Sequence, residues 1–246
     1  LGRKGYKVNL IDPIVNSVVN NLNPLNGTQA SLGVLMGNIY KKSKGRAFLL
    51  RNKSMQLWRE WLIEIDHSES NIKLEKPLIK LASSEKEYQS MIELSKNKRE
   101  YGIELLDKTS IEFWNSIFEK KLIGGIISIE DGRLNPIKLI KLLMKSLDKL
   151  KVNKIEDNVI KIERNNNSMN KNWKIYLEHN NSICQDFIVL CSAINTQKIL
   201  SSLGHIIDLE PILGQVVELE IENKITNWNK WPAILNYQSI NFIPHN

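Results

Sequence analysis

YKVNLID, at residues 6–12, is the most informative stretch of the sequence, because it alternates and then becomes apolar, with β-branched Val8 and Ile11. This pattern predicts a buried strand that ends at Asp12. In a dinucleotide-binding βαβ unit, the acid after the second strand accepts hydrogen bonds from a ribose hydroxyl. A strand-terminating aspartate in a turn before Pro13 is an equally good interpretation of Asp12 taken alone.

The residues before this strand, Leu1 to Gly5, indicate the last turn of a helix, closed by basic residues and a glycine. The sequence has no initiator methionine and no signal sequence. We therefore expect the natural beginning of the protein to lie upstream. The glycine-rich phosphate loop that precedes such an acid by about 20 residues would also lie there.

A second informative segment, GTQASLGVLMG at residues 27–37, follows the acid after a loop rich in Asn, Pro and Gly. Its small side chains would let backbone donors approach an anionic or planar ligand closely. Gly33 and Gly37 also suit a close approach of the backbone. A tight packing loop is the alternative interpretation of this segment.

Hydrophobic periodicity predicts a mixture of helices and strands along the rest of the chain. Apolar residues at helical spacing predict helices at 47–65, 85–98, 109–118, 136–150 and 196–203. Apolar and β-branched runs predict strands at 103–106, 122–129, 159–163, 173–177, 187–190, 216–221 and 233–243. The pattern is typical of parallel strands at the beginning of the chain and of antiparallel strands at its end. The predicted fold class is therefore α/β with an α+β tail.

The composition excludes several classes of protein. The net charge is +7, but the lysines are spread over nearly every segment, whereas a nucleic-acid binder concentrates them in one stripe. No apolar run approaches the roughly 20 residues that span a bilayer. Cys184 and Cys191 have no metal-ligand spacing and indicate no disulfide framework. We expect a cytoplasmic protein with no nucleic-acid partner, no integral membrane segment and no metal.

Several segments, taken in order, resemble FAD-dependent oxidoreductases of the D-amino-acid oxidase and glycine oxidase (DAO) superfamily. Besides residues 6–12 and 27–37, they are GGIISIEDGRLNPIKLIKLLMKSL (124–147), NVIKIERNN (158–166), DFIVLCSAINTQ (186–197) and EPILGQVVELE (210–220). The resemblance covers almost the whole chain. It implies an incomplete Rossmann-like FAD-binding domain at residues 1–48 and 130–208. A mixed or antiparallel-sheet substrate domain, also incomplete, would be interleaved with it at residues 49–129 and 209–246.

The resemblance also implies which residues meet the cofactor, FAD. By analogy with that family, Asp12 binds the ribose, and the backbone amide and carbonyl of Val159 contact the adenine. The small-residue segment that holds the pyrophosphate and the flavin side contributes Thr28, Ser31 and Gly33. Ala193 stands where relatives have a glycine that passes close to FAD, so its methyl group puts tight binding in doubt if φ must be positive.

Three further residues are implied on the substrate side. Gly214 and Gln215 would lie near the flavin ring, although Leu213 stands where relatives usually have a basic residue. Tyr237 is a candidate catalytic residue, because it is near the right strand. The arginine that clamps the substrate carboxylate in relatives is expected beyond residue 246.

The implied reaction is oxidation of a C–N bond in an amine or small amino acid, with hydride transfer to the flavin. Oxygen or another electron acceptor would reoxidise the flavin, and a homo-oligomer is compatible with this interpretation. Three alternatives stay open. One is an amino-acid dehydrogenase of the same fold that uses a quinone or a dye. The second is a non-catalytic remnant or nucleotide-binding module, and the third is a polyanion-binding protein.

Overall fold

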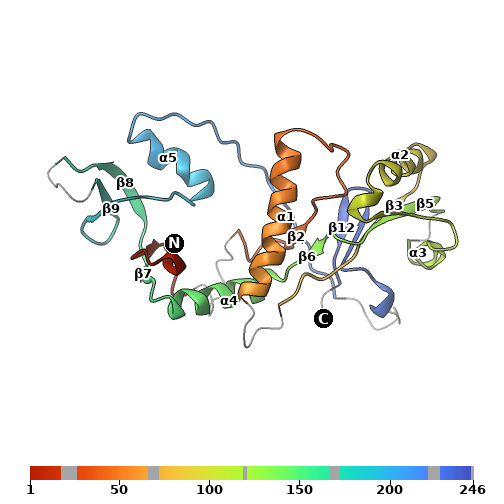
Figure 1. The fold of residues 1–246 in the computed structure, drawn as a ribbon, viewed down its shortest axis with the longest axis horizontal. Coiled ribbons are helices and arrows are strands. Elements are labelled where there is room, and N and C mark those ends of the chain that lie inside the picture. The colour runs from red at the N-terminus through yellow and green to blue at the C-terminus, as the bar shows by residue number, and fades with distance from the viewer. Residues whose placement is uncertain (18–26, 66–71, 119–120, 167–171, 221–227, 245–246) are drawn as a thin grey trace. The chain divides into compact units, whose positions relative to one another are not determined.

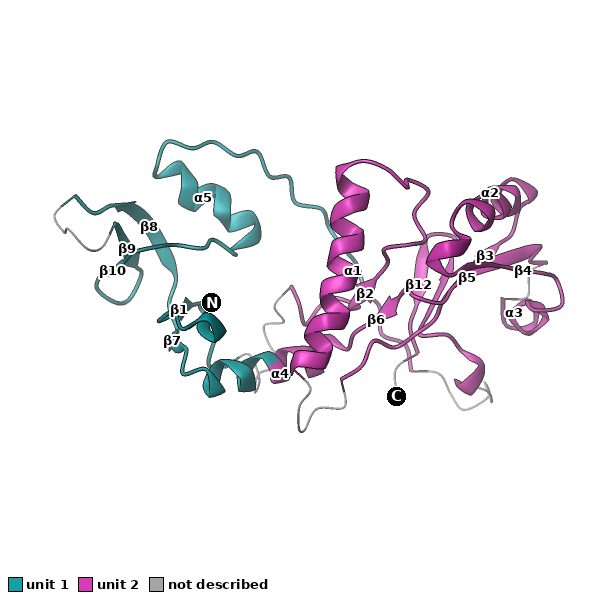
Figure 2. Cartoon of the chain, viewed as in Figure 1, with its two compact units in different colours: residues 1–25, 143–215 teal, residues 26–142, 216–246 magenta. Residues whose placement is uncertain are grey.

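The computed structural model describes residues 1–17, 27–65, 72–118, 121–166, 172–220 and 228–244. The chain forms two compact units, and each is built from two separate stretches of sequence (Figure 2). Unit 1 comprises residues 1–25 and 143–215, and unit 2 comprises residues 26–142 and 216–246. The expected division into an FAD-binding and a substrate domain stays a prediction.

Unit 2 is organised around a five-stranded sheet with the order β12-β11-β3-β5-β4 (Figure 1). Its strands are β3 (Leu78–Ala82), β4 (Ile103–Leu106), β5 (Gly124–Ser128), β11 (Ile234–Tyr237) and β12 (Ile240–Phe242). β11 runs parallel to β3, and the other neighbouring strands are antiparallel. Segments more than 100 residues apart in sequence therefore share one sheet.

Two helices cover opposite faces of this sheet, α2 (Glu85–Asn97) and α3 (Glu112–Phe118) (Figure 1). Successive strand residues point to opposite faces, so Leu81 packs with Trp114 of α3 while Ala82 packs with Met91 of α2. The helix α2 begins at a capping box in which Ser84 and Glu87 satisfy each other's backbone N–H groups.

A second part of unit 2 joins α1 (Arg46–Ile65) to a two-stranded antiparallel pair, β2 (Val34–Leu35) and β6 (Gly132–Arg133). Apolar residues of α1 pack with Leu134 and with the first turns of α4 (Pro136–Lys149). The helix α4 begins where expected, because the Asn135 side chain accepts the Lys138 N–H at 3.0 Å.

Unit 1 contains two small sheets. The parallel pair β1 (Asn9–Ile11) and β7 (Asn153–Ile155) forms one, and the antiparallel order β10-β9-β8 forms the other. The remaining elements are β8 (Val159–Arg164), β9 (Trp173–Leu177), β10 (Ile183–Gln185), the short helix α5 (Thr196–Ser201), and the 3₁₀ turns η1 (Gly2–Lys4) and η3 (Ala193–Asn195). Apolar residues of both sheets and of α5 form one cluster.

The sequence prediction of strands was wrong in several places. Residues 187–190 and 216–220 form no strand, and residues 233–243 form the hairpin β11–β12 with left-handed backbone at Gln238 and Ser239. The segment 187–190 keeps the alternation of a strand, since Ile188 and Leu190 pack inward. It finds no hydrogen-bonding partner among the described residues, and an extended segment without a ladder is not a strand.

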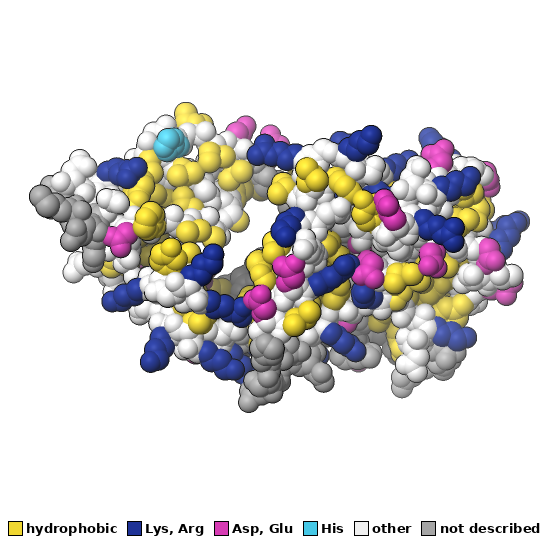
Figure 3. Space-filling view, in the orientation of Figure 1, with side chains coloured by type: hydrophobic (Ala, Val, Ile, Leu, Met, Phe, Trp, Pro, Cys, Tyr) yellow, Lys and Arg dark blue, Asp and Glu magenta, His cyan; other side chains and the backbone are white. Residues whose placement is uncertain are grey.

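The observed architecture is the expected mixed α/β fold with a parallel opening and an antiparallel tail. Basic side chains are scattered among acidic ones over the face of each unit seen in Figure 3, as the sequence predicted. None of the helices in the described ranges has the length and apolar character that crossing a membrane requires.

Candidate functional site

Asp12 lies in unit 1, directly after the parallel strand β1. Its backbone N–H donates to Ile155 O at 3.1 Å, which extends the β1–β7 pair by one residue. Its Oδ1 accepts the Ile14 N–H at 3.0 Å, and the side chain is exposed. The exposed carboxylate at the carboxyl end of a parallel strand can accept further hydrogen bonds, as ribose binding requires. It also forms the local turn that was the alternative interpretation.

Val159 opens β8 in the same unit and packs on the cluster that also receives Ile11 and Ile155. Its pairing with Leu177 is followed by an irregularity before Lys161, so the ladder is interrupted at Ile160. A bulge leaves backbone groups outside the ladder. The adenine contact expected of the Val159 backbone stays a prediction, and the interruption beside it is compatible with that role.

The turn before Val159 is held by a buried carboxylate that the sequence analysis did not single out. Asp157 accepts the backbone N–H groups of Asn158, His179 and Asn180, at 2.7 to 3.3 Å. Burial of Asp157 raises its pKa, but the hydrogen bonds from Asn180, His179 and Asn158 outweigh this and lower the pKa below the ordinary value. Asp157 therefore fixes the place where β8 begins.

Ala193 occupies a left-handed conformation, with φ of 46°, at the start of η3. This is the conformation that glycine adopts at no cost and that an L-residue adopts only under strain. The suspected conflict is therefore present in the backbone, because the turn keeps a geometry suited to glycine although the residue is alanine. Its contact with FAD stays a prediction.

The small-residue segment lies in unit 2, where residues 28–31 form a turn. The Ser31 hydroxyl donates to Thr28 O at 2.7 Å, and both residues are exposed. Gly33 has φ of 67°, and a Cβ there would lie 1.9 Å from Leu134 O. The Leu134 N–H also donates to Gly33 O at 2.9 Å. Only glycine fits this position, because both its backbone conformation and the close approach of Leu134 exclude a side chain.

The loop after β2 is anchored by Asp131, which is fully buried. Its carboxylate accepts the backbone N–H groups of Gly37, Asn38 and Ile39 at 2.9 to 3.2 Å, and also the Asn38 side-chain amide at 3.2 Å. Successive N–H groups that converge on one anion form a nest. Asp131 thus connects the end of the small-residue segment to the β5–β6 corner.

Lys98 holds the same loop from the other side. Its buried ammonium donates to Asn38 O at 3.0 Å and to Tyr40 O at 2.5 Å. Burial and the neighbouring Arg51 lower the pKa of Lys98, while Asp131 raises it. Asp131 and Lys98 together bind three backbone N–H groups and two backbone carbonyls of residues 37–40, which holds this loop within unit 2.

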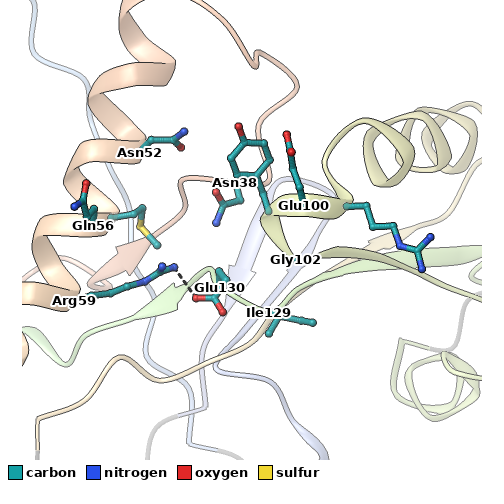
Figure 4. Close-up of a pocket in the computed structure, with 11 residues that line it drawn as sticks. Asn38, Asn52, Gln56, Arg59, Glu100, Gly102, Ile129 and Glu130 are labelled. Atoms are coloured by element: carbon teal, nitrogen blue, oxygen red, sulfur yellow. Dashed lines mark hydrogen bonds and ion pairs between the residues drawn. The ribbon is translucent and has the colours of Figure 1, made fainter.

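A polar pocket of about 440 Å³ lies beside that loop, between α1, residues 99–102 and the β5–β6 corner; we call it the Arg59 pocket. Figure 4 shows Asn52 and Arg59 extending into it from α1. Arg59 Nη2 donates to Glu130 Oε2 at 2.6 Å across the pocket. None of the residues predicted from the sequence lines it. Its residues come from four separate segments and have no local spacing that a sequence motif could reveal.

The substrate-side predictions also stay open. Gly214 and Gln215 are exposed, and nothing lies within 4 Å of a Cβ added at Gly214. Tyr237 is 5% exposed, its ring packs 4.8 Å from that of Phe118, and its buried hydroxyl has no hydrogen-bond partner among the described residues. The environment of Tyr237 is that of a core residue.

The predicted cofactor residues are divided between the two units. Asp12, Val159 and Ala193 belong to unit 1, and Thr28, Ser31 and Gly33 belong to unit 2. Within unit 1, Asp12 directly follows β1, and Val159 opens β8, the next strand after β7 in sequence, and packs in one cluster with Ile11 and Ile155. These features fit a nucleotide: an exposed acceptor follows a parallel strand, and turns of left-handed geometry stand at both predicted close approaches.

The parallel pair, the interleaved units and the mixed sheet place the chain among α/β proteins with a Rossmann-like part. The sequence model of the family described as DAO, FAD dependent oxidoreductase, matches residues 24–246. The chain therefore belongs to the family of FAD dependent oxidoreductases, whose cofactor is FAD. No curated protein sequence matches the chain.

Solved structures show the same fold at low sequence identity. Glycine oxidase from Geobacillus kaustophilus is 17% identical with a TM-score of 0.67, and the match covers 83% of this chain and 53% of that one. Iminodiacetate oxidase from Chelativorans sp. BNC1 is 17% identical with a TM-score of 0.63, and the match covers 83% and 53%. L-Amino acid deaminase from Proteus myxofaciens is 13% identical with a TM-score of 0.62, and the match covers 84% and 44%. The chain spans about half the length of these proteins.

Proposed function

We propose that the protein takes part in FAD-dependent oxidation of an amine or a small amino acid. The family match over residues 24–246 carries this proposal. The names of the similar structures give the substrate class, since they are an oxidase of glycine, an oxidase of iminodiacetate and a deaminase of L-amino acids. Glycine, iminodiacetate and L-amino acids all have a C–N bond beside a carboxylate.

When bound, FAD supplies the hydride acceptor for breaking the C–H bond next to nitrogen. The role of this chain's own residues is to bind and orient. Asp12 is proposed to accept a ribose hydroxyl hydrogen bond, and the Thr28–Gly33 segment to offer backbone donors to the anionic part of the cofactor. The Asp131 and Lys98 contacts hold residues 37–40, which follow that segment, and this anchoring is proposed to keep its donors in one arrangement.

The test uses the purified protein loaded with FAD and mixed without oxygen with glycine, iminodiacetate or an L-amino acid. We expect at least one of them to bleach the flavin absorbance, whereas matched acids without the amino group leave it unchanged. Bound flavin that none of these amines reduces would overturn the proposed substrate class.

The electron acceptor is settled by a second measurement on the same samples. Oxygen consumption during turnover is the result expected for an oxidase. Reduction of a quinone or dye without oxygen consumption would instead identify a dehydrogenase of the same fold. The proposed cytoplasmic location and the compatibility with a homo-oligomer rest on the sequence alone.

A further inference from the structure

A cavity of about 650 Å³ lies in unit 2, at the end of the sheet where β3 and β11 begin and β12 ends. We call it the Arg133 cavity. It is formed by residues 73–76 before β3, residues 228–233 before β11, Pro244 after β12, and the beginning of α4. None of the residues assigned to FAD lines it.

Basic side chains outnumber acidic ones around the Arg133 cavity. Among the described residues that line it, Lys73, Lys76, Lys138 and Arg133 are basic, and Glu75 is the one acid. Lys76 and Arg133 are partly neutralised, because Lys76 Nζ lies 3.2 Å from Glu130 Oε2 and Arg133 Nε lies 3.2 Å from Glu75 Oε2. The remaining excess of positive charge favours an anion, and the first turn of α4 adds the positive end of a 14-residue helix.

The Arg133 side chain is only 6% exposed and is incompletely satisfied by the described part of the chain. Its Nε lies 3.2 Å from Glu75 Oε2 without forming a hydrogen bond, and its Nη1 donates to Pro244 O over a long 3.5 Å. A guanidinium has five N–H donors in a planar fork. A buried guanidinium with so few acceptors is suited to a carboxylate or phosphate, which it can bind through two parallel hydrogen bonds.

Two tryptophans give the other side of the cavity a different chemistry. Trp228 and Trp231 both line it, and their ring centroids are 5.3 Å apart. Trp228 is 40% exposed, although a large aromatic side chain is usually covered. The Trp231 Nε1 is buried and has no hydrogen-bond partner among the described residues. Aromatic faces favour a planar apolar group, and the indole N–H would donate to an oxygen of the same ligand.

We propose that the Arg133 cavity binds an aryl-substituted organic anion, whose carboxylate or phosphate meets Arg133 and whose ring packs on Trp228. The buried guanidinium of Arg133 favours a negatively charged ligand, and the two tryptophans favour a ligand with an aromatic ring. The volume is within the range of about 300 to 1,000 Å³ that is usual for small-molecule sites.

Calorimetric titration of the full chain tests this proposal without any flavin. The probes are phenylacetate and phenyl phosphate, which distinguish a carboxylate from a phosphate ligand, together with inorganic phosphate and benzyl alcohol. We expect saturable binding of at least one aryl anion. Inorganic phosphate should bind about tenfold more weakly, because it lacks the ring. Benzyl alcohol should not bind, because it lacks the charge.

Variants identify the residues responsible. Arg133→Gln should weaken binding about tenfold or more, whereas Glu75→Gln should strengthen it about threefold by removing the competing carboxylate. Lys86→Gln, an exposed lysine outside the cavity, is the control and should leave affinity unchanged. If Arg133→Gln does not fold, the other two variants still test the site. Trp228→Leu should weaken binding of the aryl anion, and Glu75→Gln should strengthen it.

Absence of saturable binding by both aryl anions would overturn the proposal, as would an affinity that neither Glu75→Gln nor Trp228→Leu changes. Because no flavin is present in this experiment, its failure leaves the proposed oxidase function untouched. Failure of flavin reduction likewise leaves this site untouched.

Discussion

Unit 2 and unit 1 bury their apolar side chains to different degrees. The five-stranded sheet of unit 2 is covered on both faces, and residues such as Leu78, Ile126 and Leu235 are fully buried. Unit 1 has two small sheets, and Phe187 and Ile212 are 80% and 95% exposed. Unit 2 is therefore expected to resist unfolding more strongly, because local stability follows buried apolar contacts.

The largest expected effect is that of Asp131→Ala in unit 2. The substitution leaves three backbone N–H groups and the Asn38 amide without their buried acceptor. We expect a loss of about 3 kcal/mol in the free energy of unfolding. Hydrogen exchange should show lost protection around residues 37–40, with little change in β8–β10. Asp148→Ala, which breaks only an exposed ion pair with Lys154, is the control. Equal losses in the two variants would contradict the assigned role.

Gly33→Ala is expected to have the next largest effect. The new Cβ would lie 1.9 Å from Leu134 O in a backbone with φ of 67°, so the β2–β6 pair must shift. A cost of about 2 kcal/mol is expected in chemical denaturation. Gly45→Ala is the matched control, because Gly45 also has positive φ but nothing lies within 4 Å of its Cβ. The difference between the two variants isolates the close approach of Leu134.

Ala193→Gly should act in the opposite direction, in unit 1. Glycine relieves the left-handed strain at φ of 46°, so we expect a gain of about 1 kcal/mol in stability. The gain should appear as slower hydrogen exchange in η3 and α5 and be absent from unit 2. A less stable Ala193→Gly protein would show that the alanine is held there without strain.

The smallest effect is expected at Asp107, at the start of α3. Hydrogen bonds from the Ser110 backbone, Thr109 and the Ser110 hydroxyl lower its pKa to about 2. A carboxyl whose folded pKa is depressed stabilises the fold above its unfolded pKa of about 3.9, and the contribution is lost as the pH falls toward 2. Asp107→Asn should flatten the dependence of the melting temperature on pH in this window. An unchanged dependence would contradict this assignment.

The comparison of the units also shows what could be predicted from the sequence. The helices α1, α2 and α4 were predicted nearly to their ends, because periodicity and caps such as Asn135 are local signals. The strand β3 was missed, since no element was predicted between the helices at 47–65 and 85–98. Residues 187–190 were given a strand because alternation shows which side chains can be buried and not which strand will pair.

The candidate site shows the same limit. Asp12 and Gly33 could be named, because each stands in a recognisable segment. Asp131 was quoted only within the segment 124–147, and Lys98 only as the end of the helix predicted at 85–98. Their shared loop lies 93 and 60 residues away in sequence, respectively. Buried polar contacts of such separation leave no periodic pattern, so they appear only in the folded chain.

The most direct test of the account is a calorimetric titration of the protein with FAD, comparing the unaltered chain with Asp12→Ala. The account predicts saturable binding that Asp12→Ala weakens about tenfold, since a charge-assisted hydrogen bond to the ribose is lost. The control Asp186→Asn, an exposed carboxylate elsewhere in unit 1, should bind FAD as the unaltered chain does. Binding that is equally strong in the Asp12→Ala protein, or no binding at all by the unaltered chain, would contradict it.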